Sequence, residues 1–250
     1  MNATEQYIAD RDTQVRFNMQ DKQLKRRTDR YMEYLVATNY GKNFTWMGIP
    51  IIQFPSDLMV MQEIIWKVKP DYIIETGVAF GGMITFYASI LEAIGKGKAL
   101  GIDIDPRKHN MDLLEVHPLR HRIDIVKGSS TDEKVIDAVK NYISPLIPKP
   151  VIMACLDSNH TKDHVLQELR LYSPLVSVGS YIVVFDTAIE FVGSPAGSRG
   201  EWGRGNSPWT AVQEFMKDND EFVVDTEVET RALVTAAPGG WLKRIKEAKV

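Results

Sequence analysis

From residue 57 onward, short runs of apolar residues alternate regularly with segments of helical periodicity. The apolar runs predict buried strands, and the segments between them predict helices. Strands that are apolar throughout and alternate with helices form a parallel sheet that is covered on both faces. The alternation therefore predicts an α/β fold with a doubly wound, mostly parallel, Rossmann-like sheet.

The boundaries of these elements follow from the same pattern. We expect parallel strands at 71–75, 99–103, 123–126, 151–156 and 180–185. We expect helices at 58–67, 83–94, 131–143, 161–171 and 208–218. Two later runs, 222–225 and 232–235, predict a C-terminal β-hairpin. Ligands bind such sheets at the carboxyl ends of the strands, so the residues just after each strand are the candidates for a site.

The first part of the chain lacks this alternation. Residues 1–56 begin as a polar segment with a basic patch between Lys22 and Arg30, and they continue as an aromatic stretch. We interpret 1–56 as an N-terminal extension that packs on the core, and 57–250 as the ligand-binding domain. The basic patch predicts a solvated helix face and no nucleic-acid site, because no larger basic field supports it.

Composition excludes several classes of protein. The formal net charge of −3 favours neither a nucleic-acid partner nor a membrane partner. The chain holds one cysteine, Cys155, inside an apolar run, which is typical of a reducing compartment. No apolar run is long enough to span a bilayer, and the N-terminus resembles no secretory leader. We expect a cytoplasmic protein, for which the apolar extension makes a homo-oligomer plausible.

A glycine-containing turn follows the first predicted strand. It begins at Glu75 and includes Gly77, which allows a tight turn, and Gly81, which allows close approach of a ligand. The spacing differs from the G-x-G-x-x-G turn that binds a pyrophosphate. A looser glycine turn after an acidic residue suits S-adenosylmethionine, a cofactor that has no pyrophosphate. We expect Glu75 and Gly77 to meet its methionine end. A plain strand–helix turn remains the alternative for this motif alone.

Two further strand ends complete a nucleoside site. Asp103 ends the second strand, where an acid can accept hydrogen bonds from both ribose hydroxyls. After the third strand, Ser129 or Ser130 can bond the edge of an adenine, whereas Ser130 or Thr131 could equally cap the next helix. Together with the glycine turn, these residues predict a site for S-adenosylmethionine in which Asp157, at the end of the fourth strand, also takes part.

The fourth and fifth strand ends carry the residues for chemistry. Asp157 and Asp186 would point into the same cleft, and their carboxylates can hold a hard divalent cation such as Mg²⁺. His160 shares a loop with Asp157, and an imidazole is suited to act as a general base near neutral pH. The alternative for His160 is a helix-start residue that bonds a neighbouring acid. We predict Asp157 and His160 as catalytic residues.

A glycine-rich stretch, residues 191–208, directly follows the fifth strand. A loop of this length within a compact domain is usually functional or disordered. Because it would lie at the mouth of the cleft, we interpret it as a lid that gates the substrate. Trp202 within it could stack on a sugar ring or an apolar acceptor.

Two longer motifs resemble a known family. The run from Trp46 to Asp57 and the turn from Glu75 to Gly82 are similar to the cephalosporin hydroxylase / rhamnosyl O-methyltransferase family, over about residues 40 to 240. The resemblance implies a class I methyltransferase fold and Mg²⁺-assisted methyl transfer to a hydroxyl. Asp157-Ser-Asn-His160 is also similar to the Asp-Gly-x-His segment of metal-dependent sugar O-methyltransferases, in which that histidine is the base.

One position departs from the family pattern. The family often has two adjacent acids at the end of the fifth strand, and here the first of them is replaced by Phe185. Phenylalanine cannot ligate a cation. Either no metal binds, or the third protein ligand comes from elsewhere, for which Glu190 is the candidate.

The predicted function is S-adenosylmethionine-dependent O-methylation of a sugar or small natural product. The alternatives are an oxidoreductase or hydroxylase and a catalytically inactive S-adenosylmethionine-binding module. An iron-dependent hydroxylase would need a set such as His160, Asp163 and His164, which lie within about one helical turn of each other. The nearby His164 is more typical of a hydrogen-bonded histidine on a helix face.

Overall fold

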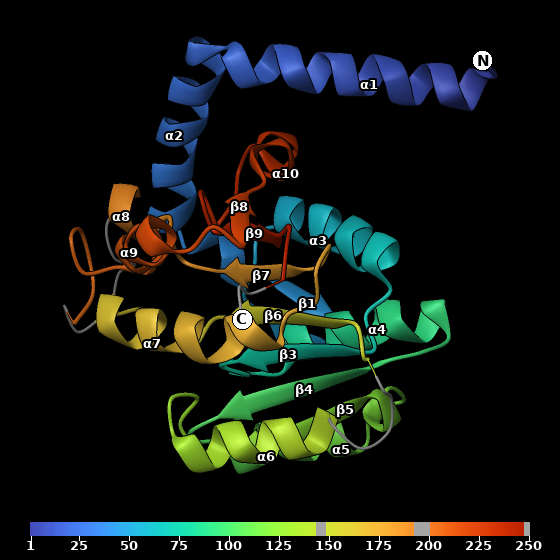
Figure 1. The fold of residues 1–250 in the computed structure, drawn as a ribbon, viewed down its shortest axis with the longest axis vertical. Coiled ribbons are helices and arrows are strands. Elements are labelled where there is room, and N and C mark those ends of the chain that lie inside the picture. Colours follow the sequence, from blue (N-terminus) through green and yellow to red (C-terminus); the bar gives the residue numbers. More distant parts are fainter. Residues whose placement is uncertain (144–148, 193–200, 248–250) are drawn as a thin grey trace.

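The computed structural model describes residues 1–143, 149–192 and 201–247, and a seven-stranded sheet lies at its centre (Figure 1). The strands are β3 Tyr72–Thr76, β4 Lys98–Asp103, β5 Ile123–Lys127, β6 Ile152–Leu156, β7 Tyr181–Val184, β8 Phe222–Val224 and β9 Trp241–Arg244. Their order is β5-β4-β3-β6-β7-β9-β8, in which β9 runs antiparallel to both β7 and β8 and the other neighbouring pairs are parallel. The order reverses at β3, so the ends of β3, β4 and β6 form a switch point at which ligands bind.

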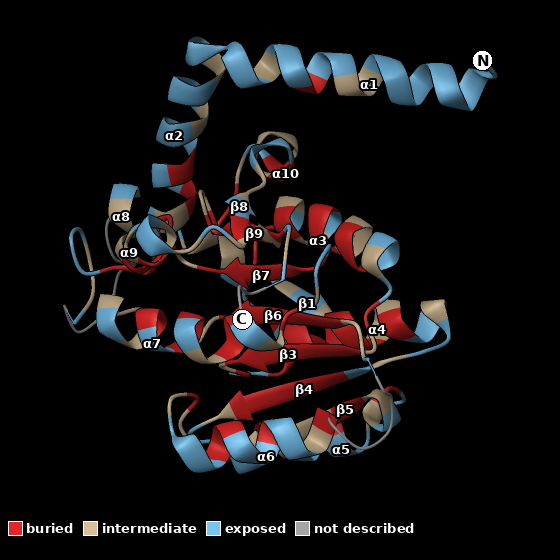
Figure 2. Cartoon of the chain, in the orientation of Figure 1, coloured by how far each residue is buried: buried red, intermediate tan, exposed pale blue. Residues whose placement is uncertain are grey.

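Helices cover both faces of this sheet. One face packs against α3 Pro55–Val68, α4 Gly82–Ile94, α5 Lys108–Glu115 and α10 Thr226–Ala232. The other packs against α6 Glu133–Ile143, α7 Lys162–Tyr172 and α9 Pro208–Asp218. Ile73 of β3 lies in the first core and its neighbour Ile74 in the second. Figure 2 shows β3, β4, β6 and β7 mostly buried. The predicted α/β fold with a mostly parallel, doubly wound sheet is confirmed.

Shorter elements complete the described chain. They are α8 Ile189–Val192 and the 3₁₀ turns η1 Tyr40–Lys42, η2 Arg120–Arg122 and η3 Ser173–Leu175. None of the helices in the described ranges is both long and apolar enough to cross a membrane.

The N-terminal segment contains two helices and a hairpin, of which the sequence predicts only an exposed helix at the basic patch. They are α1 Ala3–Gln20, α2 Lys22–Ala37, β1 Phe44–Trp46 and β2 Ile49–Ile51. Met47 and Gly48 both have positive φ, 49° and 89°, as a two-residue hairpin turn requires. Met32 and Leu35 of α2 join the core, whereas Figure 2 shows α1 exposed along most of its length. The division of the chain at residue 56 stays a prediction.

The C-terminal antiparallel pair exists, but its second strand is not the predicted one. β8 pairs with Trp241–Arg244, whereas 232–235 forms the end of α10 and a loop. The apolar run 232–235 does not form a strand, because it begins at the last residue of α10 and Leu233 then takes a positive φ of 58° that ends the helix. Gly240 lets the chain enter the sheet, since a Cβ there would lie 2.2 Å from the carbonyl oxygen of Val184.

A buried carboxyl group fixes this C-terminal loop to α3. Asp57 is 1% exposed, and its Oδ2 accepts a hydrogen bond of 2.8 Å from the Ala236 amide. Burial raises the pKa of Asp57 from 3.8 to about 7, although hydrogen bonds from Thr235 and Ala236 oppose the shift. The Ala236 carbonyl in turn accepts from the amide of Ala188, just beyond β7.

This raised pKa predicts a pH-dependent stability. The pKa of Asp57 in the folded protein exceeds its unfolded value of 3.8, so the protonated carboxyl group contributes to the free energy of unfolding. This contribution is fully present below pH 3.8 and is lost as the pH rises toward 7. A tenfold change in proton affinity corresponds to about 1.4 kcal/mol, so the loss is on the order of 4 kcal/mol. Relative to Asp57→Asn, the wild type should therefore lose free energy of unfolding between pH 4 and pH 8.

Urea denaturation of both proteins at a series of pH values measures this difference. Asp137→Asn, on the exposed face of α6, is the matched control and should keep the pH dependence of the wild type. A pH profile of Asp57→Asn that follows the wild type would contradict the assignment.

Candidate active site

Two cavities lie at the carboxyl ends of the parallel strands. The β4-side cavity, of about 520 Å³, is lined by Gly77, Ala79, Ile102, Asp103, Ile104, Gly128, Ser129, Ser130, Asp157, Ser158, Asn159, His164 and Trp202. The β7-side cavity, of about 300 Å³, is lined by the turn after β3, by Asp157, Ser158, His160 and Asp186, and by residues 35–54. Both volumes suit small molecules.

The two cavities share part of their walls. Gly77, Ala79, Asp157 and Ser158 line both of them. Molecules bound in the two cavities would therefore meet beside Asp157, between the ends of β3 and β6. A cleft of this kind can bring a group donor and its acceptor into contact.

The glycine turn after β3 has little room for side chains. Gly77 has a φ of 83°, and a Cβ there would lie 2.1 Å from the carbonyl oxygen of Asp157. Ala79 also has a positive φ, 48°. The Asp103 carboxylate holds this turn, because its Oδ2 accepts from the amides of Val78 and Ala79 at 2.9 and 3.2 Å. Asp103 thus fixes the turn and also lines the β4-side cavity.

Two predicted cofactor residues lie outside both cavity walls. Glu75 is 1% exposed beneath the turn, and its Oε2 has no hydrogen-bond partner among the described residues. Burial, and then the Asp103 carboxylate, raise the pKa of Glu75. Gly81 caps α4 with a φ of 92°, where a Cβ would meet the side chain of Leu114. The structure therefore brings Gly77, and not Glu75 or Gly81, to the surface of the cleft.

The predicted serines lie in the β4-side cavity beside a network that the sequence did not predict. Ser130 Oγ lies 3.0 Å from Nε2 of His164, and Ser158 Oγ lies 3.1 Å from the same nitrogen. Ser158 also donates to the fully buried Glu168 at 2.7 Å. Ser129 lines the cavity next to them. An isolated acid in a helix gives no signal of burial, which is why Glu168 was missed.

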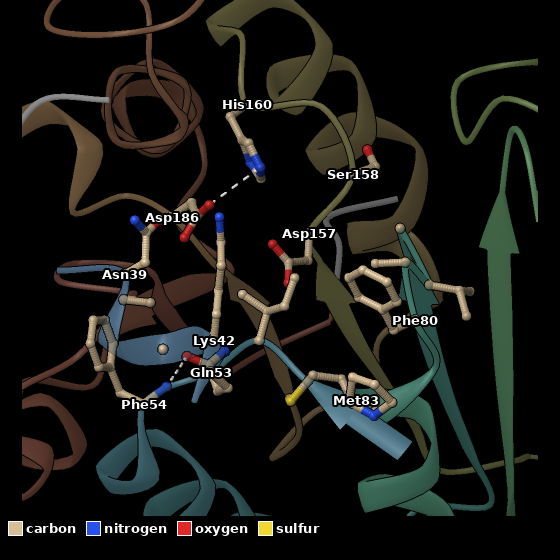
Figure 3. Close-up of a pocket in the computed structure, with 18 of the residues that line it drawn as sticks. Asn39, Lys42, Gln53, Phe54, Phe80, Met83, Asp157, Ser158, His160 and Asp186 are labelled. Atoms are coloured by element: carbon tan, nitrogen blue, oxygen red, sulfur yellow. Dashed lines mark hydrogen bonds and ion pairs between the residues drawn. The ribbon is translucent and has the colours of Figure 1, made fainter. Parts of the chain in front are cut away.

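Three potential metal ligands converge at the ends of β6 and β7. Ligand atoms of Asp157, His160 and Asp186 lie within 4.8 Å of one another. His160 Nε2 lies 3.3 Å from Asp186 Oδ2 (Figure 3). Burial, and then the Asp186 carboxylate, raise the pKa of Asp157. Asp186 has a φ of 56°, in the left-handed region that aspartate enters more readily than most residues.

The third member of this group is His160, whereas the sequence predicts Glu190 as the third ligand. The Oε2 of Glu190 accepts from the Gly205 amide at 2.9 Å and the Ser207 hydroxyl at 2.7 Å. Its role as a ligand stays a prediction. Asp163 and His164, suggested for an iron site, are likewise absent from the group of potential ligands found in the described chain.

Phe185, which stands where the family often has an acid, is a core residue. It is 2% exposed and packs edge-on against Trp241, with ring centres 6.1 Å apart. Its side chain belongs to the core that α3 and α4 cover. The position therefore contributes packing to the sheet and no charge to the cleft.

The proposed lid can be followed only in part. Residues 193–200 lie outside the described residues, so the gating role stays a prediction. Trp202 lies in the described part, where its ring meets the His160 ring edge-on at 5.2 Å. Stacking of Trp202 on an acceptor stays a prediction.

One wall of the β7-side cavity comes from the N-terminal segment, which the sequence analysis had not assigned to the site. Its members include Leu35, Asn39, Lys42, Gln53 and Phe54, several of which Figure 3 shows facing Asp157 and Asp186. Neither periodicity nor a motif marks these residues. Their place depends on how α2 and the hairpin dock on the core.

Known proteins are similar to this one over most of its chain. The family model described as rhamnosyl O-methyltransferase/CmcI matches residues 38–245. The rhamnosyl O-methyltransferase of Mycobacterium tuberculosis is 33% identical over 208 residues, covering 80% of this chain and 78% of that protein. The protein of the same name from Mycobacterium leprae is 30% identical over 228 residues, covering 88% and 93%.

Solved structures show the same fold. CmcI with Mg and SAM is similar with a TM-score of 0.57 at 16% identity, covering 82% of this chain and 78% of that one. The apo structure of CmcI has a TM-score of 0.58 at 17% identity, covering 82% and 77%. The span matched by the family model agrees with the resemblance found in the sequence.

Proposed function

The chain belongs to the rhamnosyl O-methyltransferase/CmcI family, and we propose that its cleft methylates a hydroxyl of a sugar or a small natural product. The family makes the chain an S-adenosylmethionine-dependent O-methyltransferase. The observation that carries the finer proposal is the shared wall of the two cavities at Asp157. One cavity would hold the methyl donor and the other the hydroxyl acceptor.

The β4-side cavity suits the donor. It joins a strained glycine turn, an acid at the end of β4 and two serines at the end of β5. Asp103 uses Oδ2 for two backbone amides and Oδ1 for the amide of Asp105, at 2.8 Å. A carboxylate has about four lone-pair sites, so it can still accept from a ribose hydroxyl. Ser129 and Ser130 would face the adenine.

The β7-side cavity holds the base for the acceptor. As the acceptor oxygen forms its bond to the methyl carbon, the carbon–sulfur bond breaks and the acceptor must lose its proton. We assign that proton to Nε2 of His160, which lines the cavity. Asp186, 3.3 Å from that nitrogen, then stabilises the imidazolium. The remaining acceleration comes from holding oxygen and methyl group in contact.

Asp157 and Asp186 would also hold a divalent cation. Two carboxylates among ligand atoms within 4.8 Å fit Mg²⁺, which prefers oxygen ligands and leaves the His160 nitrogen free. When bound, the ion supplies positive charge that favours ionisation of the acceptor hydroxyl. The family resemblance supports this assignment, and Glu190 remains a candidate for a further ligand.

Removal of the metal tests this assignment. We expect EDTA to slow methyl transfer by roughly 100-fold, since a metal contributes several kcal/mol to such reactions. Added Mg²⁺ should restore the wild type but not Asp186→Asn. Mass spectrometry of deuterated methyl transfer to a panel of sugars and phenols measures the rates.

Asp163→Asn is the matched control for this experiment. Asp163 is an exposed acid in the first turn of α7, close in sequence to His160 but outside the ligand group. Its response to EDTA and Mg²⁺ should be that of the wild type. Equal rates in EDTA and Mg²⁺ for the wild type would remove the metal from the proposal.

A further inference from the structure

The wall of the β7-side cavity opposite the catalytic residues carries a lysine side chain that has no role in the proposed reaction. Its polar side chains are those of Asn39, Lys42 and Gln53. Gln53 is buried, and its Oε1 accepts from the Phe54 amide at 2.9 Å. Lys42 is the only lysine or arginine among the described residues that line this cavity.

The fold places Lys42 at this wall. Asn39 takes a left-handed φ of 53°, which turns the chain from α2 into η1. The Gly41 carbonyl then accepts from the Gln53 amide at 2.9 Å, which ties η1 to the residues after β2. Figure 3 shows the Lys42 side chain extended along the cavity, with its ammonium end toward Asp186 and His160. No ion pair or hydrogen bond of this ammonium is found within the described part of the chain.

The charges that line the β7-side cavity do not cancel once a divalent cation is bound. Asp157 and Asp186 together carry two negative charges when ionised, and a divalent cation would cancel them. Phe185 adds no carboxylate, because its side chain lies in the core. The loaded cavity therefore retains the single positive charge of Lys42. Complementary charge on a ligand improves both its binding and its selection over neutral molecules.

We propose that the methyl acceptor carries an anionic group, a carboxylate or a phosphate, near the hydroxyl that is methylated, and that Lys42 binds this group. The inference rests on the proposed function of the cleft. A lysine ammonium offers three donors and a point charge, which suits either kind of anion. With a divalent cation on the two carboxylates, a neutral acceptor would leave the ammonium without a counter-charge. Without the divalent cation, the two carboxylates repel the anion, so its binding requires the metal.

Binding of small probes tests the inference. The dissociation constants of D-glucuronate, D-glucose 6-phosphate and D-glucose are measured by NMR titration, with saturating S-adenosylhomocysteine and with Mg²⁺ or EDTA. In Mg²⁺ we expect the wild type to bind at least one anionic probe roughly tenfold more tightly than glucose. Lys42→Met should lose this preference while it keeps its affinity for S-adenosylhomocysteine. The anionic probe that binds identifies the carboxylate or the phosphate as the recognised group.

Lys67→Met is the matched control, because Lys67 is exposed on α3 and lines neither cavity. It should keep the wild-type preference. Equal affinity of the wild type for all three probes, an unchanged preference in Lys42→Met, or no binding of an anionic probe by protein that binds S-adenosylhomocysteine would overturn the inference. Failure to bind S-adenosylhomocysteine itself would instead count against the proposed function.

Discussion

Replacing His160 by glutamine is expected to lower kcat by roughly 10²- to 10⁴-fold, the usual contribution of a general base. Glutamine keeps a polar side chain of similar reach but cannot take the proton from the acceptor. The affinity for S-adenosylhomocysteine should stay unchanged, because His160 lines only the β7-side cavity. Single-turnover methyl transfer and calorimetric titration measure the two quantities separately.

The control for this variant is His109→Gln, which changes an exposed histidine in α5. It should retain the wild-type rate. A His160→Gln protein whose kcat falls less than tenfold would show that another group takes the proton. Equal losses of kcat and of cofactor affinity would instead indicate a structural role for His160.

Replacing Gly77 by alanine is expected to abolish binding of S-adenosylhomocysteine and to lower the free energy of unfolding by several kcal/mol. The added Cβ would lie 2.1 Å from the Asp157 carbonyl oxygen and 2.7 Å from the Ser158 Cα. Backbone atoms cannot yield as a flexible side chain can, so β3 and β6 must separate. Both cavities share the wall that would move.

Gly95→Ala distinguishes the steric clash expected at Gly77 from the strain of placing any side chain at a positive φ. Gly95 has a φ of 85°, close to the 83° of Gly77, but a Cβ there meets nothing within 4 Å. It should cost only about 1 kcal/mol and leave cofactor binding intact. Urea denaturation and calorimetry of both variants make the comparison. Similar losses in the two would contradict a special role for the turn after β3.

The sequence predicts the sheet well because its strands are buried on both faces. β3, β6 and β7 are buried along their whole length, so their positions follow from the apolar runs, and the topology then gathers Asp103, Asp157 and Asp186 at one edge. The carboxyl ends of parallel strands must meet, whatever the details of packing. This is why the strand-end candidates could be found without coordinates.

The other parts of the cleft depend on contacts between distant segments. Nothing in the sequence near Lys42 indicates that it lines the same cavity as Asp186, and Asp57 gives no sign that it bonds the Ala236 amide. The hairpin turn at Met47 lacks the asparagine or aspartate that usually marks its type. Phe185 could be identified as a departure from the family, but only the structure shows that its ring faces the core.

The most direct test of the central claim is a calorimetric titration of the purified protein with S-adenosylhomocysteine. A cleft built for S-adenosylmethionine should bind this product with a dissociation constant in the micromolar range. Asp103→Ala should lose that binding, since the carboxylate holds the turn and, in the proposed function, accepts from the ribose. No binding by the wild type, with or without Mg²⁺, would contradict the account.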